Sequence, residues 1–390
     1  RYTPTARLAD LYMPFVSGSD VALLNGMMQE IIRNGWEDKE FIAKRTKDYE
    51  KLKEVVMKET YSLENVSKIS GIPVEQLKQA AEWFGTTKPG AILYSMGITQ
   101  HTVGVDNVRS VANIQMLTGN LGKPGSGVNA LRGQNNVQGA CDMGALPVVF
   151  TGYQKVIDPA AYKKFADAWG FPGGICEPKN GYEVTVMMDV LTDNPGELKC
   201  MYIMGENPML SDPDLNHVRH ALESVEFMVV QDIFLTETAE LADVVLPAAC
   251  YAERGGTQTS TERRVQMWRK AQDPPGEAKE DWQIISELAA RMGYAAQFPY
   301  KDIEEIFDEV AVLTPSYHGM NYERLNRPEA LHWPCPDASH PGTPILHREK
   351  FSHPDGIGIF APIEWKPPAE VPDAEYPFVL TTGRVLWHWH

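Results

Sequence analysis

The chain has 390 residues, of which 43% are hydrophobic and 23% charged, with a formal net charge of −16 and an isoelectric point near 5.1. This length allows two or three domains with sizeable cores. The acidity argues against nucleic acid or an anionic membrane surface as a partner, because either needs a clustered basic face. No apolar run approaches the ~18 residues that a transmembrane helix needs, so no membrane insertion by this chain is expected.

The cysteines and the ends of the chain carry further information. None of the five cysteines forms a C-x-x-C pair, which argues against an iron–sulfur cluster held by this segment. The chain opens at Arg1 without an initiator Met and closes on a strand-like run, residues 376–390. We therefore interpret it as an internal piece of a longer polypeptide, whose compartment cannot be deduced from the lack of a signal peptide.

The first 90 residues carry helical patterns. Asp20 is placed to cap a helix that ends before Gly35, and a second helix is expected to run without a break from about 38 to 58. Two more are expected at 63–70 and 74–84. This last pair imitates a DNA-binding helix-turn-helix, but its polar residues are mixed in sign, so two helices packed on a sheet is the better interpretation.

An alternating α/β pattern begins at Ala91. We predict a buried strand over 91–96 and a helix capped by Asp106 that ends at Gly119. The run G-K-P-G-S-G at 122–127 lacks the G-x-G-x-x-G order, so nicotinamide dinucleotide binding is rejected, and the chain has no P-loop. Later elements are expected as helices at 183–191, 236–241 and from 280, strands at 200–204, 227–231 and 243–246, a helix capped by Ser211 or Asp212, an extended loop at 253–269, and irregular segments at 327–374.

Polar side chains follow the strands predicted at 200–204 and 227–231. Asn207, Ser211, Gln231 and Asp232 come at or just after their ends, and ligands of α/β sheets gather beyond the carboxyl ends of strands. Such a rim suits a nucleotide base and its diphosphate, since an aspartate accepts two N–H donors from guanine. The alternative is that Asp232 is a turn carboxylate that caps the helix at Thr236.

The densest polar run is N-A-L-R-G-Q-N-N-V-Q-G-A-C-D-M-G-A-L-P at residues 129–147. Its amides and glycines surround one arginine, Arg132, and one carboxylate, Asp142. Glycines allow close approach of the backbone to a ligand, and an arginine can hold a small carboxylate or oxyanion through two parallel N–H bonds. The alternative is a surface loop whose amides satisfy its own turns.

This run resembles the R-G-Q-N-N-V-Q-G-A-C-D-M-G signature of the catalytic subunit of formate dehydrogenases in the molybdopterin oxidoreductase family. Five further segments resemble that family in its order: M-G-I-T-Q-H at 96–101, M-G-E-N-P at 204–208, Q-D-I-F-L-T-E-T at 231–238, A-D-V-V-L-P-A-A at 242–249, and E-R-G-G-T-Q-T-S-T-E-R-R-V-Q at 253–266. The resemblance covers most of residues 1 to about 300 and is more specific than any one motif.

The resemblance implies a role for particular residues. Arg132 matches the active-site arginine that orients formate, with Gln134 beside it, and Met96 and Gln100 match the region near a pterin. Further cofactor-binding residues implied in this way are Gly205, Glu206, Asn207, Ser211, Gln231, Asp232, Thr236, Asp281 and His388. His388 and His390 share one side of a strand, but two ligands without a third rarely make a metal site, and no metal ligand is expected in this chain.

The fold implied is α/β, with two Rossmann-like three-layer domains and the start of a β-barrel cap domain. The domains are expected at 1–134, 135–300 with an inserted loop at 251–279, 301–372 as irregular wrapping segments, and 373–390 as the start of the cap. The family's metal ligand, which is Cys or Sec, and the four cysteines of its [4Fe–4S] cluster belong to an N-terminal part that this chain does not contain.

The activity implied is reversible oxidation of formate to CO2 at a molybdenum or tungsten bis(molybdopterin guanine dinucleotide) centre. Electrons would pass through the [4Fe–4S] cluster to an iron–sulfur or flavin partner subunit, and a cytoplasmic location is expected. Two alternatives stay open. One is a related enzyme acting on another oxyanion such as nitrate, and the other is a non-catalytic scaffold like the large iron–sulfur subunit of respiratory complex I.

Overall fold

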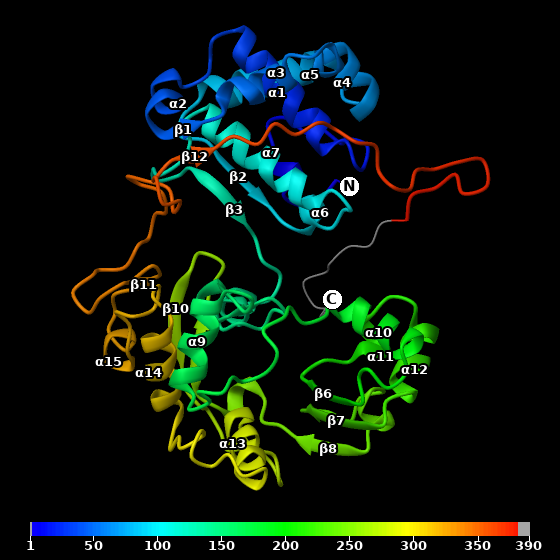
Figure 1. Cartoon of the computed structure of the whole chain (residues 1–390). Helices are drawn as coiled ribbons and strands as arrows, with labels where there is room; N and C mark the ends of the chain where they lie inside the picture. The colour runs from blue at the N-terminus through cyan, green and yellow to red at the C-terminus, as the bar shows by residue number, and fades with distance from the viewer. Residues whose placement is uncertain (1, 381–390) are drawn as a thin grey trace. The chain divides into compact units, whose positions relative to one another are not determined.

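A computed structural model describes residues 2–380. Within these residues the chain forms two compact units, one of residues 2–133 with 345–380 and the other of residues 134–344 (Figure 1). The division falls between Gly133 and Gln134, inside the polar run at 129–147. The mixed α/β class predicted from the sequence is confirmed, whereas the finer domain limits stay predictions. No helix in the described part of the chain is long and apolar enough to cross a bilayer.

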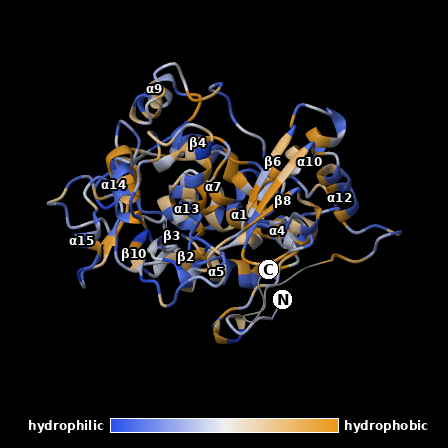
Figure 2. Ribbon diagram, turned by 90° about the horizontal axis from the view of Figure 1, so that it is seen from below, coloured by the Kyte–Doolittle hydropathy of each residue, from blue (hydrophilic) through white to orange (hydrophobic). Residues whose placement is uncertain are grey.

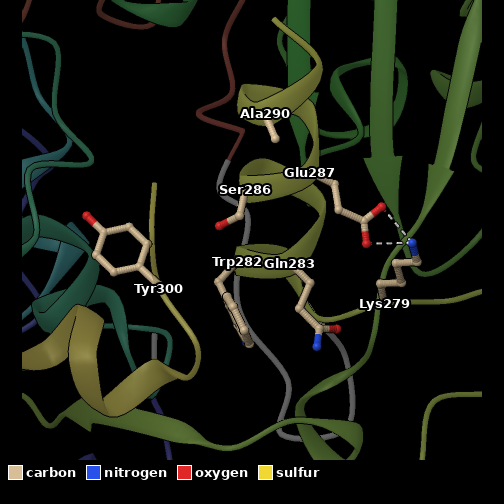
Figure 3. Close-up of a pocket in the computed structure, with 7 residues that line it drawn as sticks. All are labelled: Lys279, Trp282, Gln283, Ser286, Glu287, Ala290 and Tyr300. Atoms are coloured by element: carbon tan, nitrogen blue, oxygen red, sulfur yellow. Dashed lines mark hydrogen bonds and ion pairs between the residues drawn. The ribbon is translucent and has the colours of Figure 1, made fainter. Parts of the chain in front are cut away.

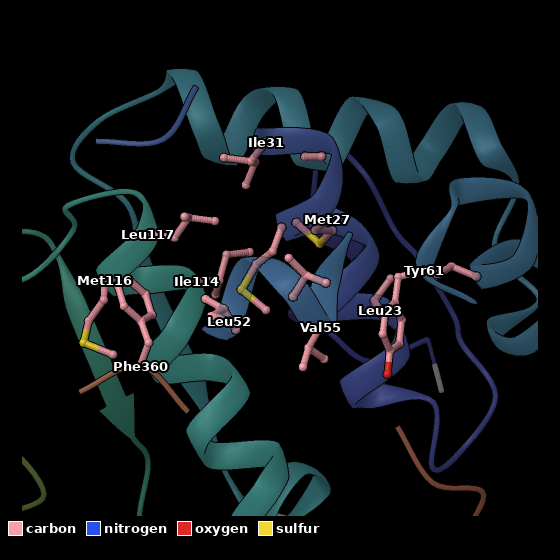
Figure 4. Close-up of a cluster of buried hydrophobic side chains, with 14 of the residues drawn as sticks. Leu23, Met27, Ile31, Leu52, Val55, Tyr61, Ile114, Met116, Leu117 and Phe360 are labelled. Carbon is pink, nitrogen blue, oxygen red and sulfur yellow. The ribbon is translucent and has the colours of Figure 1, made fainter. Parts of the chain in front are cut away.

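The first unit is mainly helical. Its helices are α1 (Asp20–Arg33), α2 (Lys39–Arg45), α3 (Tyr49–Val56), α4 (Leu63–Ser70), α5 (Val74–Thr86), α6 (Met96–Thr99) and α7 (Gly104–Leu117), with 3-10 turns η1 (Ala6–Leu8) and η2 (Glu59–Tyr61). Apolar side chains of α1, α3, α4, α5 and α7 bury one another in a single core. Figure 4 shows Met27 and Ile31 of α1, Leu52 of α3 and Ile114 of α7 in this core.

The long helix expected from about 38 to 58 is wrong. Strand β1 (Thr46–Lys47) separates α2 from α3, and the next residue, Asp48, has a φ of 65°. β1 pairs in parallel with β12 (Gly358–Ile359), which lies near the other end of the chain. The helical pattern is interrupted because this distant segment takes the backbone hydrogen bonds of β1.

The segment after residue 345 belongs to the first unit through specific contacts. Asn113 of α7 exchanges two hydrogen bonds of 2.7 and 3.0 Å with the backbone of Ala361. Asn25 of α1 donates to the carbonyl of Ile363 at 2.9 Å, and Phe360 inserts into the core (Figure 4). Buried amides therefore satisfy the backbone of a segment that has little regular structure of its own.

Asp20 is the first residue of α1 rather than its cap, and it is 3% exposed. Its Oδ1 has no hydrogen-bond partner among the described residues. Burial raises the pKa of Asp20, opposed by a hydrogen bond from its own backbone and by the charge of His101.

We expect Asp20→Asn to raise the melting temperature at pH 7. A raised pKa means that the folded protein binds the proton of Asp20 more tightly than the unfolded chain does. The free energy of unfolding therefore falls as pH rises from the unfolded pKa, about 4, through the higher folded pKa. Below that window the carboxyl is neutral in both states, so the advantage of the variant should disappear. Thermal unfolding at pH 7 and at pH 3.5 measures both effects; an equal advantage at the two pH values would contradict the assignment.

The parallel strand pair of the first unit positions the first group of candidate residues. β2 (Ala91–Tyr94) pairs in register with β3 (Gly127–Ala130), from Ala91 opposite Gly127 to Tyr94 opposite Ala130. The strand predicted over 91–96 is confirmed at its start, but β2 stops at Tyr94 and is not buried throughout, because Leu93 is 62% exposed. Only the face with Ile92 and Val128 packs against the helical core.

The α7 helix packs against this strand pair (Figure 1). Asp106 does not cap α7, which begins two residues earlier, at Gly104. Asp106 instead lies in the first turn, where a carboxylate is favourable to the helix dipole, and pairs with Arg109 at 3.8 Å. The helix ends at Leu117, followed by Gly119 with a φ of 64°.

The second unit contains a three-stranded parallel sheet. Its strands are β6 (Cys200–Met204), β7 (Phe227–Asp232) and β8 (Val244–Pro247), in the order β6-β7-β8. Helices α10 (Val184–Asp193), α11 (Pro208–Ser211) and α12 (Leu215–Glu223) and the turn η4 (Ala239–Leu241) accompany it. Figure 2 colours β6 as mostly hydrophobic, and Ile203 and Val230 are buried in a core with α10 and α12.

The strands and α10 confirm the sequence-based elements to within one or two residues. The predicted cap of α12 is wrong, because Asp214 rather than Ser211 or Asp212 accepts the backbone N–H of His217. The helix predicted at 236–241 is reduced to the single turn η4.

The second unit also contains an antiparallel sheet of β9 (Gly256–Thr259), β10 (Arg264–Trp268) and β11 (Leu331–His332), in the order β11-β10-β9. The extended loop expected at 253–269 contains the hairpin of β9 and β10. Helix α14 (Ile303–Leu313) lies within the range 301–372 that was expected to be irregular. The remaining elements are α8 (Val137–Asp142), β4 (Val149–Phe150), η3 (Thr151–Tyr153), β5 (Gln154–Lys155), α9 (Pro159–Ala168), η5 (Tyr251–Glu253), α13 (Asp281–Arg291) and α15 (Tyr322–Leu325).

Candidate active site and cofactor-binding residues

The carboxyl ends of β2 and β3 bring together three of the predicted residues. Met96 begins the helical turn α6 directly after β2, Gln100 ends that turn, and Arg132 follows β3 by two residues. Parallel strands end at the same edge, so these side chains lie at one edge of the pair. Met96 is 39% exposed, and Gln100 and Arg132 are also exposed.

The turn that carries Met96 and Gln100 is anchored to α7. Asn107, which is 1% exposed, donates from Nδ2 to the carbonyl of Ile98 at 2.9 Å. Nε2 of His101 lies 3.0 Å from the carbonyl oxygen of Gly97. A buried amide therefore fixes the backbone of the turn, while Met96 and Gln100 stay accessible.

The polar run after Arg132 divides into an exposed and a buried part. Arg132 and Gly133 are exposed and Gln134 is half-buried, and an added Cβ at Gly133 would meet nothing within 4 Å. Further along, Asn136 accepts the backbone N–H of Thr259 at 2.9 Å. The interpretation that the amides of this run satisfy the chain's own backbone therefore holds for Asn136, while the ligand-binding role of Arg132 and Gln134 stays a prediction.

Asp142 is the centre of the buried part, with an exposed fraction of 1%. Its Oδ1 accepts from Nε2 of Gln138 at 2.8 Å and from the Tyr153 hydroxyl at 2.8 Å. Its Oδ2 accepts from the Tyr317 hydroxyl at 2.6 Å, and the same hydroxyl lies 2.9 Å from Oγ1 of Thr259. The carboxylate thus connects α8 to the β9–β10 hairpin and to the segment after α14.

The rim of the second sheet begins where β6 ends. Gly205 has a φ of 65° and open space at its Cβ position, and Glu206 and Ser211 are exposed. The Ser211 hydroxyl donates to Oε1 of Glu206 at 2.7 Å. The exposed backbone at Gly205 leaves room for a ligand to approach beside these side chains.

Asn207 connects this rim to the chain after β7. Its Oδ1 accepts from the Thr238 hydroxyl at 2.7 Å, and its Nδ2 donates to Oε2 of Glu237 at 2.8 Å. Thr236 supports the same turn, because its Oγ1 accepts the backbone N–H of Ala239 at 3.1 Å. In this structure both predicted cofactor residues also have local structural contacts.

Asp232 ends the central strand β7. Its Oδ1 accepts the backbone N–H groups of Ile233 and Phe234 at 2.6 and 3.3 Å, whereas its Oδ2 takes part in no hydrogen bond with the described residues. Asp232 is thus a turn carboxylate, as the alternative interpretation held. It does not cap the helical turn that follows, because the hydroxyl of Thr236 accepts the backbone N–H of Ala239 there. A fixed carboxylate with one oxygen to spare fits a base that donates N–H groups, as guanine does.

Gln231 has a different environment from its neighbour. Its side chain is 0% exposed, accepts from the Tyr202 hydroxyl and donates to Oδ1 of Asp281 at 2.7 Å. Oδ2 of Asp281 lies 3.8 Å from Nε of Arg254. Gln231 therefore orients Asp281. The side chain of Asp281 is 32% exposed, so Asp281 is better placed than Gln231 to meet a ligand.

A cavity of about 430 Å³ lies beside α13 (Figure 3). Its lining is Lys279, Trp282, Gln283, Ser286, Glu287, Ala290 and Tyr300. Figure 3 shows Tyr300 across from Trp282 and Ser286, while Lys279 pairs with both carboxylate oxygens of Glu287 at 2.7 Å. The lining contains none of the predicted site residues, and its one lysine is already neutralised.

His388 and the rest of the range 381–390 lie outside the described residues. Residues 373–380 of the expected cap segment contain no strand. No group of three or more His, Cys, Asp or Glu side chains in residues 2–380 is arranged to hold a metal ion.

Several residues near these sites were missed by sequence reasoning. Tyr202 and Thr238 contact predicted residues, and Tyr153 and Tyr317 contact Asp142. No local pattern shows these contacts, which join residues from 11 to 175 positions apart in the sequence. The alternation of β6 is the one available indication, since it places Tyr202 on the opposite face from Ile203.

Comparison with known proteins identifies the class. The sequence model of the molybdopterin oxidoreductase family matches residues 1–291, and the chain belongs to this family. The fold agrees: acetylene hydratase from Pelobacter acetylenicus matches with a TM-score of 0.68 over 92% of this chain and 50% of that chain, at 24% sequence identity. A cofactor of the molybdopterin type is implied by this membership.

Individual relatives narrow the comparison. The chain is 52% identical over its whole length to the F420-dependent formate dehydrogenase 1 subunit alpha of Methanococcus maripaludis and 44% identical to formate dehydrogenase H of Escherichia coli. The assimilatory nitrate reductase catalytic subunit of Bacillus subtilis is 37% identical. The chain spans 56%, 54% and 55% of these relatives, respectively.

Proposed function

We propose that the protein containing this chain is a formate dehydrogenase catalytic subunit, which oxidises formate reversibly to CO2, a proton and two electrons. The observation that carries the proposal is the exposed Arg132 at the carboxyl end of β3, within a motif that resembles that of formate dehydrogenases. The identity of 52% over the entire chain supports it, compared with 37% to the nitrate reductase.

Arg132 supplies what a one-carbon carboxylate requires. Its two outer N–H groups would donate to the two formate oxygens in a planar fork, which neutralises the charge and leaves the C–H bond directed away from the guanidinium. The Gln134 amide adds an uncharged donor two residues later. Fixing both oxygens restricts formate to one orientation, and orientation is a large part of catalysis for so small a substrate.

The cofactor that fits is a bis(molybdopterin guanine dinucleotide) complex of molybdenum or tungsten, which when bound supplies the two-electron acceptor. Met96 and Gln100 would contact a pterin. The residues that would border the nucleotide are Gly205, Glu206, Asn207 and Ser211. Asp232 and Asp281 would accept hydrogen bonds from guanine, while Gln231 would orient Asp281 and Thr236 would support its own turn. The [4Fe–4S] cluster, the electron-accepting subunit and the cytoplasmic location stay predictions.

Formate-dependent viologen reduction by the full-length protein, purified without oxygen, tests the proposal. We expect turnover with formate and none with viologen alone, together with molybdenum or tungsten and pterin in the sample. Reduced viologen with nitrate is the matched assay for the rival. Turnover with nitrate but not with formate, in a sample loaded with metal and pterin, would replace formate by another oxyanion; a sample without pterin would favour the scaffold.

A further inference from the structure

Tyr94 is the last residue of β2, directly beside the end of β3. It pairs with Ala130, and its carbonyl accepts the backbone N–H of Leu131 at 2.7 Å. This bond extends the ladder of backbone hydrogen bonds by one residue, and Arg132 is the next residue after it. Tyr94 therefore holds the backbone of the residue that precedes Arg132.

The side chain of Tyr94 stands on the same face of the pair as that of Ala130. Paired residues of neighbouring strands point to the same face, and residues two apart in an extended chain do so as well. Arg132 is two residues beyond Ala130, which makes it the diagonal neighbour of Tyr94, within reach of an aromatic and a long side chain.

The environment of the phenol agrees with this placement. Tyr94 is half-buried at the edge of the pair, whereas Leu93, on the opposite face, is 62% exposed. Burial raises the pKa of Tyr94, and the positive charge of Arg132 acts in the opposite direction. The charge of Arg132 thus acts on the Tyr94 hydroxyl, which agrees with the diagonal placement that the strand register gives.

We propose that Tyr94 is the positioning residue for Arg132: its ring restricts the guanidinium to the orientation in which the two outer N–H groups meet a small carboxylate. The inference rests on the proposed function for the identity of that carboxylate. The ring, rather than the hydroxyl, limits the arginine, because a planar aromatic surface excludes guanidinium rotamers on its side and favours contact with a cation.

The experiment compares Tyr94→Phe, Tyr94→Leu and Tyr94→Ala in the full-length protein with Leu93→Ala as a control on the opposite face. We expect the Ala and Leu variants to raise KM for formate about 10-fold to 10²-fold, with a smaller change in kcat and unchanged metal and pterin content. Tyr94→Phe and Leu93→Ala should resemble the parent protein. A Phe variant as impaired as the Leu variant would place the effect in the hydroxyl and overturn the assignment.

Labelling of Arg132 with phenylglyoxal, followed by peptide mass spectrometry, reads its position independently of turnover. The Leu and Ala variants should label Arg132 faster than the parent, and formate should protect it only at higher concentration. Equal labelling rates in all variants would overturn the role of Tyr94 even if formate is the substrate. A parent protein that does not turn over formate yet shows the labelling difference would overturn the proposed function and retain the positioning role.

Discussion

Replacing Arg132 by alanine is expected to lower kcat/KM for formate by about 10² to 10³, the usual effect of losing one preorganised charge-bearing donor group. Arg132 is an exposed cation at the carboxyl end of β3, and under the proposed function its loss would leave the formate charge without its fork of donors. The kcat/KM of Arg132→Lys should lie between those of the parent protein and Arg132→Ala, because lysine keeps the charge and loses the bidentate geometry. Steady-state viologen reduction measures all three proteins.

The control for this prediction is Arg109→Ala, in the same unit. Arg109 lies on α7 with 61% of its side chain exposed and pairs with Asp106 at 3.8 Å, so its removal should leave turnover unchanged. Added guanidinium ion should restore part of the activity of Arg132→Ala, because it replaces the missing group. It should restore no activity if the variant is inactive through misfolding or loss of the cofactor. A rate in Arg132→Ala equal to that of the parent, at normal metal and pterin content, would remove Arg132 from the site.

The sequence was informative wherever the cause of structure is local. Helix α4, ended by Gly71, and strands β6 and β7 were predicted closely, because hydrophobic spacing and a terminating glycine act over a few residues. The break between α2 and α3 was not predicted, since it depends on pairing of Thr46 with Gly358. A helical pattern cannot show that a distant segment competes for its backbone.

The candidate site follows the same division. The polar rim at Asp232 follows from a strand end that the pattern locates. The strand β3, which positions Arg132, was not predicted, because its four residues lie in a run rich in glycine and asparagine. The buried state of Gln231 and its hydrogen bond to Asp281 could not be predicted from the pattern either. The sequence pattern of a glutamine at a strand end is the same whether the side chain faces solvent or a carboxylate. Within the run at 129–147, motif resemblance identified the important segment but could not separate Arg132, which is exposed, from Asp142, which is buried.

Loss of the Tyr317 hydroxyl should loosen the segment that follows Arg132. Tyr317 is 1% exposed, and burial together with the charge of Asp142 raises the pKa of its phenol, so that the hydroxyl stays protonated and able to donate. Tyr317→Phe removes a charge-assisted hydrogen bond from a buried carboxylate, which costs about 1–3 kcal/mol. Asp142→Ala removes the carboxylate that accepts from Gln138, Tyr153 and Tyr317 together, so it should cost more than Tyr317→Phe, at about 1–3 kcal/mol for each donor that finds no other acceptor.

Hydrogen exchange over residues 134–144 is the appropriate measurement, because a multidomain protein does not unfold in one step. Exchange should accelerate in Tyr317→Phe and more in Asp142→Ala. The control is Tyr322→Phe: the hydroxyl of Tyr322 bonds to no described residue, so its removal should leave exchange unchanged. The raised pKa also predicts that protection falls above about pH 10, where unfolded tyrosines ionise and the folded phenol retains its proton. Unaltered exchange in Asp142→Ala would show that this network does not hold the segment, and the fixed position of Arg132 would then depend on the β2–β3 ladder and Tyr94 alone.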